Sequence, residues 1–220
     1  MFLSVLIPTI NEEKSIGNTI RGIEKHLKNV RHEIIIIDTN STDGTERIAK
    51  KLGAKVVNEP RRGYGRAYKT GFSHAKGDLI ATLDADSTYP IESVMRLVKL
   101  LEKEGVDFVS GQRIRSRGMS LLHRFGNFTI TSCANVLFFT RFRDSQSGMW
   151  VFKKSLLKEM DLTNSSWPFS GEIKIEAWRH GKFIETPIAY RKRKGDSKVR
   201  SWKVGWENIK FLFKKRFGMS

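Results

Sequence analysis

The chain of 220 residues has a single cysteine and therefore forms no internal disulfide bond, as expected of a protein from a reducing compartment. No run approaches about 18 uninterrupted apolar residues, so we predict no transmembrane helix. The first apolar run, Phe2–Ile7, is too short for a signal peptide and lacks a basic start, so we predict no signal peptide. No G-x-G-x-x-G motif follows that run, which disfavours a dinucleotide-binding dehydrogenase.

Positive charge, in contrast, is in excess. The 40 Lys and Arg residues outnumber the 23 Asp and Glu residues and give a formal net charge of +17. We therefore expect an anionic partner, which can be nucleic acid, a phosphorylated ligand or an anionic membrane surface. A hydrophobic content of 39% with 29% charged residues is typical of a globular chain. The length predicts one ordinary domain with a sizeable core.

Strand and helix patterns alternate along the first half of the chain. The Ile-rich run 33–37 is continuous, which is typical of a strand covered on both faces. Alternating strands and helices predict an α/β fold with a mostly parallel, doubly wound sheet. We expect strands at residues 2–7, 33–37, 55–57, 79–83 and 108–110. Helices are expected at about 11–27, 45–52 and 91–104, and a further helix follows the loop 61–65 and runs through residue 72.

The pattern changes after Gly111, where arginines alternate with large apolar residues. The stretch 113–142 predicts one or two amphipathic helices that are basic on one side and apolar on the other. Pro187 interrupts the last apolar run, which favours a position at the edge of the sheet. In this half we expect strands at 148–152 and 183–190, and helices at 155–160 and 171–180.

Two carboxylates, Asp84 and Asp86, follow the expected strand at 79–83, and Pro90 opens the next helix. In open α/β sheets, ligands bind outside the carboxyl ends of the strands. Two carboxylates at such an end suit a divalent cation, which prefers oxygen ligands. A solvated turn is the alternative, because Asp and Ser also favour turns.

Four polar segments at the ends of the expected strands occur in a defined order. They are PTINE at 8–12, DTNSTDGT at 38–45, RRGYGRAYKTG at 61–71 and DAD at 84–86. In this order and spacing they resemble the inverting nucleotide-sugar glycosyltransferases of family two. The resemblance implies a GT-A fold, which is a Rossmann-like three-layer sandwich around a mostly parallel central sheet, with C-terminal amphipathic interfacial helices.

The second half resembles the branch of that family that glycosylates polyprenyl (dolichyl-type) phosphate. The segments that carry this resemblance are GQRI at 111–114, DSQSGMWVF at 144–152, the helix around Glu172 and RKGDSK at 193–198. We expect one domain at residues 1–200, with a nucleotide-sugar half at 1–111 and an acceptor half at 112–200. An amphipathic helix is expected at 201–220.

The resemblance implies roles for the donor-side residues. Asp38 accepts a hydrogen bond from the nucleobase of the donor, and Glu12 lies beside the ribose. The loop Arg61–Gly65 holds the diphosphate, and its glycines let the backbone come close to the phosphates. Asp84 and Asp86 hold Mg²⁺ or Mn²⁺, which neutralises the leaving nucleoside diphosphate. The donor-binding set is Pro8, Thr9, Asn11, Glu12, Asp38, Asn40, Asp43, Arg61, Gly63, Gly65, Asp84 and Ala85.

A phosphate acceptor needs no catalytic base, because a second pKa of about 6 leaves a phosphate monoester a dianion at neutral pH. It needs cations instead, and arginine offers bidentate geometry. In the segments that carry the resemblance, the acceptor-phosphate residues are Arg113, Arg124, Arg193 and Lys198. Arg113 and Arg124 join Asp84 and Asp86 as the expected catalytic set.

Four further residues are expected to orient the arginines or the sugar hydroxyls: Asp144, Gln146, Ser147 and Glu172. Asp144 and Glu172 also remain possible bases for a hydroxyl acceptor. The chain lacks a QxxRW-type element, which family members that polymerise polysaccharide usually carry.

The C-terminal segment places Trp202, Trp206, Ile209 and Phe213 on one helical stripe among lysines and arginines. Tryptophan with basic residues on an amphipathic helix suits the headgroup interface of an anionic membrane. The alternative is a helix that packs on its own domain. We expect a peripheral protein at the cytoplasmic face of a membrane.

The sequence therefore predicts sugar transfer from a nucleotide-sugar to polyprenyl phosphate. UDP-GlcNAc, UDP-glucose and GDP-mannose all fit as donors, with UDP-linked sugars favoured. One alternative is a glycosyltransferase with a soluble saccharide acceptor, which needs a carboxylate base. The other is a basic nucleic-acid-binding protein, which the charge alone favours. Nucleic acid is not expected as a partner, because it leaves the strand-end acids unexplained.

Overall fold

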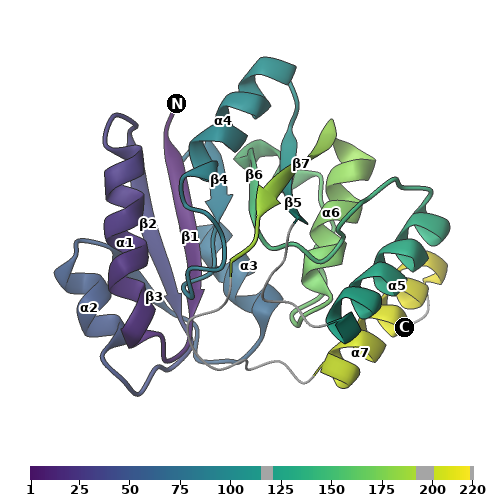
Figure 1. Cartoon of the computed structure of the whole chain (residues 1–220), viewed down its shortest axis with the longest axis horizontal. Helices are drawn as coiled ribbons and strands as arrows, with labels where there is room; N and C mark the ends of the chain where they lie inside the picture. The colour runs from purple at the N-terminus through teal and green to yellow at the C-terminus, as the bar shows by residue number, and fades with distance from the viewer. Residues whose placement is uncertain (115–120, 192–200, 219–220) are drawn as a thin grey trace.

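The apolar runs of the sequence form one seven-stranded sheet in the computed structural model, which describes residues 1–114, 121–191 and 201–218 (Figure 1). The strand order is β3-β2-β1-β4-β6-β5-β7, and only β6 runs antiparallel to its neighbours. The prediction of a mostly parallel sheet with β7 at its edge is confirmed. The strands are β1 (Leu3–Thr9), β2 (His32–Asp38), β3 (Lys55–Asn58), β4 (Leu79–Thr82), β5 (Phe108–Ile114), β6 (Trp150–Lys153) and β7 (Phe183–Ala189).

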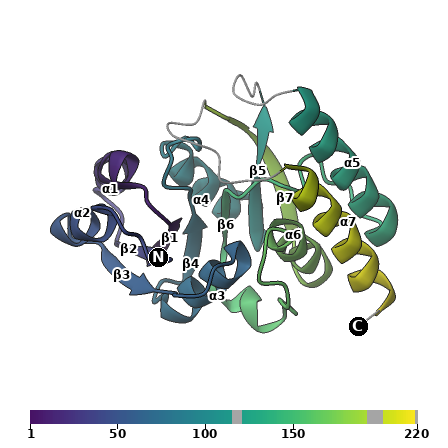
Figure 2. The same cartoon turned by 90° about the horizontal axis from the view of Figure 1, so that it is seen from below.

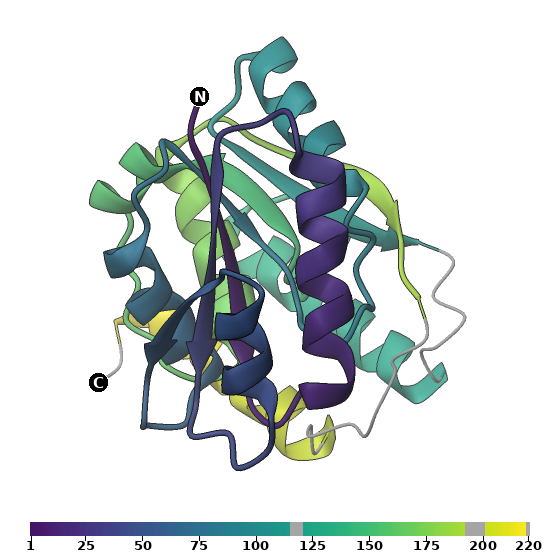
Figure 3. The ribbon, with the colours of Figure 1, turned by 90° about the vertical axis from the view of Figure 1, so that its left-hand side faces the viewer.

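Helices cover both faces of this sheet and give three layers (Figures 2 and 3). Helices α1, α2 and α4 pack on one face, and α3 and α6 pack on the other. One or two helices were expected in the region 113–142, and its described part from residue 121 onward contains one, α5. The helices are α1 (Glu13–Leu27), α2 (Thr45–Lys51), α3 (Tyr64–His74), α4 (Ser93–Glu104), α5 (Leu121–Phe138), α6 (Phe169–His180) and α7 (Ser201–Phe217).

Several element boundaries differ from the sequence-based expectation by a few residues, and two of the differences have a local cause or change the helix type. Helix α4 begins at Ser93 rather than directly after Pro90, because a turn comes first, in which the Ser93 N–H donates to the Pro90 carbonyl at 2.9 Å. The helix expected at 155–160 is a short 3₁₀-helix, η1 (Lys154–Lys158).

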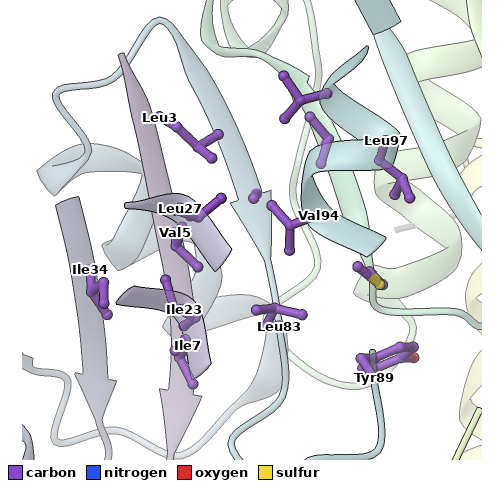
Figure 4. Packing of buried hydrophobic residues seen from close by; sticks show 14 of the residues in the cluster. Leu3, Val5, Ile7, Ile23, Leu27, Ile34, Leu83, Tyr89, Val94 and Leu97 are labelled. Carbon is purple, nitrogen blue, oxygen red and sulfur yellow. The ribbon is translucent and has the colours of Figure 1, made fainter. Parts of the chain in front are cut away.

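Side chains on the central strands alternate between two cores. On β1, Val5 and Ile7 pack with Leu27 of α1 and Val94 of α4 (Figure 4). Leu6 points to the opposite face and packs with the aromatic residues of α3 and α6. Because both faces are buried, the strands need continuous apolar runs. Each such side chain contributes about 1.5–3 kcal/mol when it is fully buried.

A third cluster holds the C-terminal helix on the domain. It contains Ile130 and Phe138 of α5, Ile175 of α6 and Leu212 of α7. Helix α7 lies alongside α5 at the end of the molecule, as Figures 1 and 2 both show. The C-terminal segment therefore packs on its own domain through one of its faces.

The other face of α7 carries aromatic side chains in solvent. Trp202 is 80% exposed and Trp206 is 60% exposed, whereas Asn208 and Leu212 are each 2% exposed. Three members of the predicted stripe, Trp202, Trp206 and Phe213, are thus on the outer side. Among the described residues, no helix is both long and apolar enough to cross a membrane.

We expect Leu212→Ala to lower the free energy of unfolding by about 2–5 kcal/mol, because it leaves a cavity between α5, α6 and α7. Urea unfolding followed by circular dichroism measures this loss. Phe213→Ala, on the exposed side of the same helix, is the matched control and should cost less than about 1 kcal/mol. Equal losses in the two variants would contradict the packing of α7.

Candidate active site

Polar loops meet at the carboxyl ends of β1, β2 and β4. The register places Thr9 at the end of β1 opposite Asp38 at the end of β2. The Leu83 N–H donates to the Leu6 carbonyl at 3.1 Å, so the residues after β4 begin beside the end of β1. Because these strands are parallel, their loops share one edge of the sheet, where open α/β folds bind ligands.

A cavity of about 720 Å³ opens among these loops. The second half of the chain contributes to its wall from β5, the turn before β6, the segment before α6, and the helices α5 and α7. Many expected site residues therefore share one cavity. Those that line it are Pro8, Thr9, Asn11, Glu12, Gly63, Asp84, Ala85, Asp86, Arg113 and Gln146.

Asp84 and Asp86 lie on a tight turn after β4. Ser87 adopts a positive φ of 63°. Asp86 is 4% exposed, and its Oδ1 accepts hydrogen bonds from the N–H of Thr88 at 3.0 Å and from its hydroxyl at 2.7 Å. Thr88 therefore fixes the orientation of the Asp86 carboxylate, which faces the cavity together with that of Asp84.

The chemistry of this pair fits a hard divalent cation. Mg²⁺ is usually held by one or two carboxylates together with substrate phosphates and water, rather than by a full protein cage. Within residues 1–114, 121–191 and 201–218, no three His, Cys, Asp or Glu residues form a larger metal-binding group. Asp84 and Asp86 would thus share Mg²⁺ or Mn²⁺ with a phosphorylated ligand.

The glycine loop before α3 is shaped by the chain that covers it. Gly63 has a φ of 153°, and a Cβ there would lie 2.3 Å from the carbonyl oxygen of Ser165. A Cβ on Gly65 would lie 2.7 Å from the carbonyl oxygen of Asn164. Both glycines are required by this backbone packing, whereas the sequence explained them by the approach of a diphosphate.

The neighbouring arginines take different positions. Arg61 forms an ion pair with Glu59, whose pKa is lowered to about 2 by hydrogen bonds from Arg61 and Thr70. Arg61 does not line the cavity, but Arg62 and Tyr64 do. The cation available to a bound phosphate in this loop is therefore Arg62, which the donor-binding set left out.

Asp38, which was expected to contact the nucleobase, is buried against Thr9 and Ser41. It is 4% exposed, and its Oδ1 accepts hydrogen bonds from the hydroxyls of Thr9 at 2.9 Å and Ser41 at 2.6 Å. Its Oδ2 accepts a hydrogen bond from the Ser41 N–H at 2.8 Å. Thr39, the next residue, lines the cavity instead. In this structure Asp38 connects the end of β1 with the loop that follows β2.

Asn40 and Asp43 have comparable positions in the same loop. The Asn40 side chain donates to the Pro60 carbonyl at 3.2 Å. Asp43 accepts a hydrogen bond from the Glu13 N–H at 3.1 Å and from both the N–H and the hydroxyl of Thr45. Burial alone would raise the pKa of Asp43, but these hydrogen bonds lower it. Neither side chain lines the cavity.

Arg113 of β5 supplies a cation from the second half of the chain. Its Nε and Nη2 each lie 2.8 Å from one oxygen of Asp144, and its N–H donates to Asp144 at 3.1 Å. The two side chains are only 10% and 9% exposed. The guanidinium also lies over the Tyr190 ring, 5.4 Å from its centroid. Arg113 therefore reaches the cavity in one fixed orientation.

Lys174, which sequence reasoning missed, supports this pair from behind. It is fully buried on α6, and its ammonium donates to the backbone carbonyl of Asp144. Burial lowers the pKa of Lys174 to about 8, although the neighbouring carboxylates of Asp144 and Glu185 oppose this shift. Arg113 keeps the pKa of Asp144 below its ordinary value despite the burial.

The remaining acceptor-side predictions fall in several places. Arg124 is exposed on α5 and does not line the cavity, whereas Asn127 of the same helix does. Ser147 is buried off the cavity, and its carbonyl accepts a hydrogen bond from the Trp150 indole N–H. Arg193 and Lys198 lie outside the described residues.

Glu172 has a different environment from the one expected for a base or a sugar-orienting group. It is fully buried on α6 and does not line the cavity. Its oxygens accept hydrogen bonds from the backbone N–H groups of Thr163 and Asn164 at 3.0 and 2.9 Å. Its carboxylate therefore anchors the segment that precedes α6.

Aromatic side chains complete the wall of the cavity. Tyr64 stacks on Trp167 with ring centroids 5.0 Å apart, and the Tyr89 hydroxyl accepts a hydrogen bond from the Gly148 N–H at 2.7 Å. Tyr190 adds a further ring beside Arg113. In the sequence, isolated aromatic residues are typical of any core, so only their position identifies them here.

Fold and site define this protein as a glycosyltransferase of GT-A type. The chain belongs to glycosyl transferase family 2, whose family model matches residues 4–161. That match includes the donor-side segments and the aspartates of the DAD motif. The family prediction and the prediction of an enzyme are therefore confirmed.

Three named relatives are similar to this chain in sequence. The low-salt glycan biosynthesis hexosyltransferase of Haloferax volcanii is 34% identical over 218 residues, which cover 96% of this chain and 52% of that protein. The dolichyl-phosphate hexose transferase of the same organism is 33% identical over 200 residues, covering 90% and 86%. The dolichol-phosphate mannosyltransferase of Pyrococcus furiosus is 26% identical, covering 97% and 63%. The chain thus spans from about half to most of these relatives' length.

Solved structures share the fold. Glucosyl-3-phosphoglycerate synthase from Mycobacterium tuberculosis, crystallised with Mn²⁺, UDP and glucosyl-3-phosphoglycerate, matches with a TM-score of 0.79 at 22% identity. The match covers all of this chain and 81% of that one. The same enzyme crystallised with Mg²⁺ and UDP gives a TM-score of 0.81 at 20% identity, covering 100% and 80%. At this level of identity the likeness shows the GT-A fold.

We expect Asp144→Asn to lower the free energy of unfolding by about 3–5 kcal/mol at pH 7, because Arg113 loses its buried ion-pair partner and Lys174 loses a nearby counter-charge. Glu104→Gln, at an exposed pair, is the control. Because the pKa of Asp144 is lowered from 3.8, its stabilisation is complete above that pH and is lost as the pH falls through the lowered value. Urea unfolding at pH 7 and pH 3 should therefore show a smaller difference between wild type and variant at pH 3.

Proposed function

We propose that this protein transfers a sugar from a nucleotide-sugar to polyprenyl (dolichyl-type) phosphate, with inversion at the anomeric carbon and with Mg²⁺ or Mn²⁺. UDP-GlcNAc, UDP-glucose and GDP-mannose are the candidate donors, of which we favour the UDP-linked sugars. Two relatives are named as a dolichyl-phosphate hexose transferase and a dolichol-phosphate mannosyltransferase, and these names refer to the same class of lipid. Neighbours in fold were crystallised with UDP and Mn²⁺ or Mg²⁺.

The observation that carries the proposal is the division of charge in the cavity. Within the described residues, the carboxylates that line it are Glu12, Asp84 and Asp86, all from the donor-side loops. The second half contributes the cation Arg113, and Asp144 is occupied by that arginine. A hydroxyl acceptor needs a base, whereas a phosphate dianion needs only a cation that positions it. The site therefore favours a phosphate acceptor.

On the donor side, this chain's residues bind and orient the leaving group. Arg62, Gly63, Glu12 and Thr39 all line the cavity. In this proposal Arg62 and the backbone at Gly63 hold the diphosphate, and Glu12 and Thr39 face the nucleoside. Asp84 and Asp86 would hold the cation, which stabilises the negative charge that develops on the departing nucleoside diphosphate. Tyr64 and Trp167 stack on each other and line the cavity beside this loop.

On the acceptor side, Arg113 orients the incoming phosphate. A phosphate oxygen attacks the anomeric carbon from the face opposite the nucleoside diphosphate, forming a new C–O bond as the old one breaks. No proton has to be removed from the dianion, so the reaction needs positioning and charge stabilisation. The bidentate contact with Asp144 keeps Arg113 in the required orientation.

The outer faces of α5 and α7 support a lipid acceptor. Lys210 lies 5.4 Å from the centre of the Trp206 ring, and Arg216 lies 5.6 Å from that of Phe139, so cations surround the apolar face. Such a face suits the headgroup region of an anionic membrane. We propose that the protein binds through this surface to the cytoplasmic face of that membrane as a peripheral protein. Its exposed apolar residues are Leu122, Phe125, Phe128, Val136, Phe139, Trp202, Trp206, Phe213 and Phe217.

We expect wild-type protein with polyprenyl phosphate in detergent to move label from one radiolabelled nucleotide-sugar into the organic phase when Mn²⁺ or Mg²⁺ is present. Asp86→Asn should reduce this transfer by at least about 100-fold, because the cation loses a ligand. Asp78→Asn, at the opposite end of β4, is the matched control and should retain activity. Metal-dependent hydrolysis of the donor without lipid product would contradict the lipid acceptor and favour a soluble one.

We expect Trp202→Ala/Trp206→Ala to weaken binding to vesicles that contain anionic lipid by more than about tenfold, because each buried large side chain contributes about 1.5–3 kcal/mol. Co-sedimentation with vesicles measures this loss. Trp202→Phe/Trp206→Phe keeps the aromatic surface and should retain most of the binding. Unchanged sedimentation of the Ala variant would exclude this face as the membrane contact.

A further inference from the structure

The segment 161–166, called the strap below, connects η1 to α6 and covers the glycine loop. The N–H of Gly65 donates to the Ser166 carbonyl at 3.3 Å, and that of Arg66 donates to the Ser165 carbonyl at 3.1 Å. Ser165 also occupies the space that a side chain on Gly63 would need. The position of the strap therefore fixes the backbone of a loop that lines the cavity.

Two buried carboxylates of α6 hold the strap from the other side. Glu172 accepts hydrogen bonds from the N–H and the hydroxyl of Thr163 at 3.0 and 2.9 Å and from the N–H of Asn164 at 2.9 Å. Glu176 accepts a hydrogen bond from the N–H of Asp161 at 3.0 Å. Glu172 and Glu176 are 0% and 1% exposed, so their charges need a counter-charge inside the protein.

The C-terminal helix supplies the counter-charge of Glu172 and shares that of Glu176 with Arg179, whose Nη1 lies 3.2 Å from Glu176 Oε1. Lys215 Nζ lies 3.2 Å from Glu172 Oε1 and 3.2 Å from Glu176 Oε1, and it donates to the Asp161 carbonyl at 2.8 Å. Its side chain is 8% exposed. In Figure 2, α6 lies between α3 and α7, so the contacts run from α7 through α6 and the strap to the start of α3.

We propose that Lys215 is a positioning residue for the nucleotide-sugar site. It neutralises Glu172 and, together with Arg179, Glu176, and these carboxylates hold the strap. The strap in turn sets the backbone at Gly63–Arg66, the loop proposed to bind the diphosphate. This inference rests on the proposed function, which assigns the donor to that loop. It also gives the C-terminal helix a role in donor binding that is separate from its aromatic outer face.

The test compares two adjacent lysines. Lys215→Met removes the buried charge, whereas Lys214→Met removes the same charge from the exposed side of the same helix. Isothermal titration of UDP and of GDP, each with Mn²⁺ and without lipid, gives the nucleotide Kd. We expect Lys215→Met to raise the Kd about fivefold or more, in the range typical of coupled sites, and Lys214→Met to leave it unchanged. Lys215→Arg should restore most of the affinity.

A second variant tests the strap from its other end. Lys69 of α3 donates to the Thr163 carbonyl and to the Ser165 hydroxyl, each at 3.1 Å, and does not line the cavity. Lys69→Met should also raise the Kd. The double variant Lys69→Met/Lys215→Met should raise it by less than the product of the single effects, because both lysines act through the strap.

The outcomes separate this inference from the proposed function. If wild-type protein binds neither nucleotide with Mn²⁺, the proposed donor is wrong. If wild type binds and Lys215→Met binds equally well, Lys215 is only structural and the inference is overturned. If Lys215→Met does not fold, Lys69→Met decides, and an unchanged Kd in that variant overturns the inference.

Discussion

The buried ion pair between Arg113 and Asp144 ties strand β5 to the turn before β6 at the candidate active site. Arg113 comes from β5 and Asp144 from the turn before β6, and Lys174 of α6 holds the backbone of that turn. Neither charge is stable at this depth alone, because an unpaired buried charge costs several kcal/mol. The pair therefore brings both segments together, and the guanidinium lies over the Tyr190 ring.

Several polar side chains for which the sequence predicts binding roles hold loops in this structure. Asp38 joins the ends of β1 and β2, Asp43 holds the start of α1, and Glu172 holds the strap. This use has a consequence for catalysis. The proposed reaction places one phosphate against one anomeric carbon and would lose rate with small displacements, so rigid loops would contribute to it.

The sequence predicted the sheet, its mostly parallel order and the edge at which the site lies, because these follow from local periodicity and from the direction of parallel strands. It also predicted that Asp84 and Asp86 face the same space. It did not predict that Glu172 turns away from the cavity, because the counter-charge of that carboxylate, Lys215, lies 43 residues further along the chain. The sequence also contained no indication of Lys174, because a single buried lysine leaves no periodic pattern.

Helix α7 shows why periodicity alone could not decide its orientation. The helix has two stripes: the aromatic one through Trp202 and Trp206, and another through Asn208, Leu212 and Lys215. The first is more apolar, so burial of apolar area alone would turn it inward. Buried carboxylates on α6 reverse the choice, because the second stripe brings Lys215 to them. The aromatic stripe is then left outside among cations, where a lipid headgroup layer can cover it without competing with the fold.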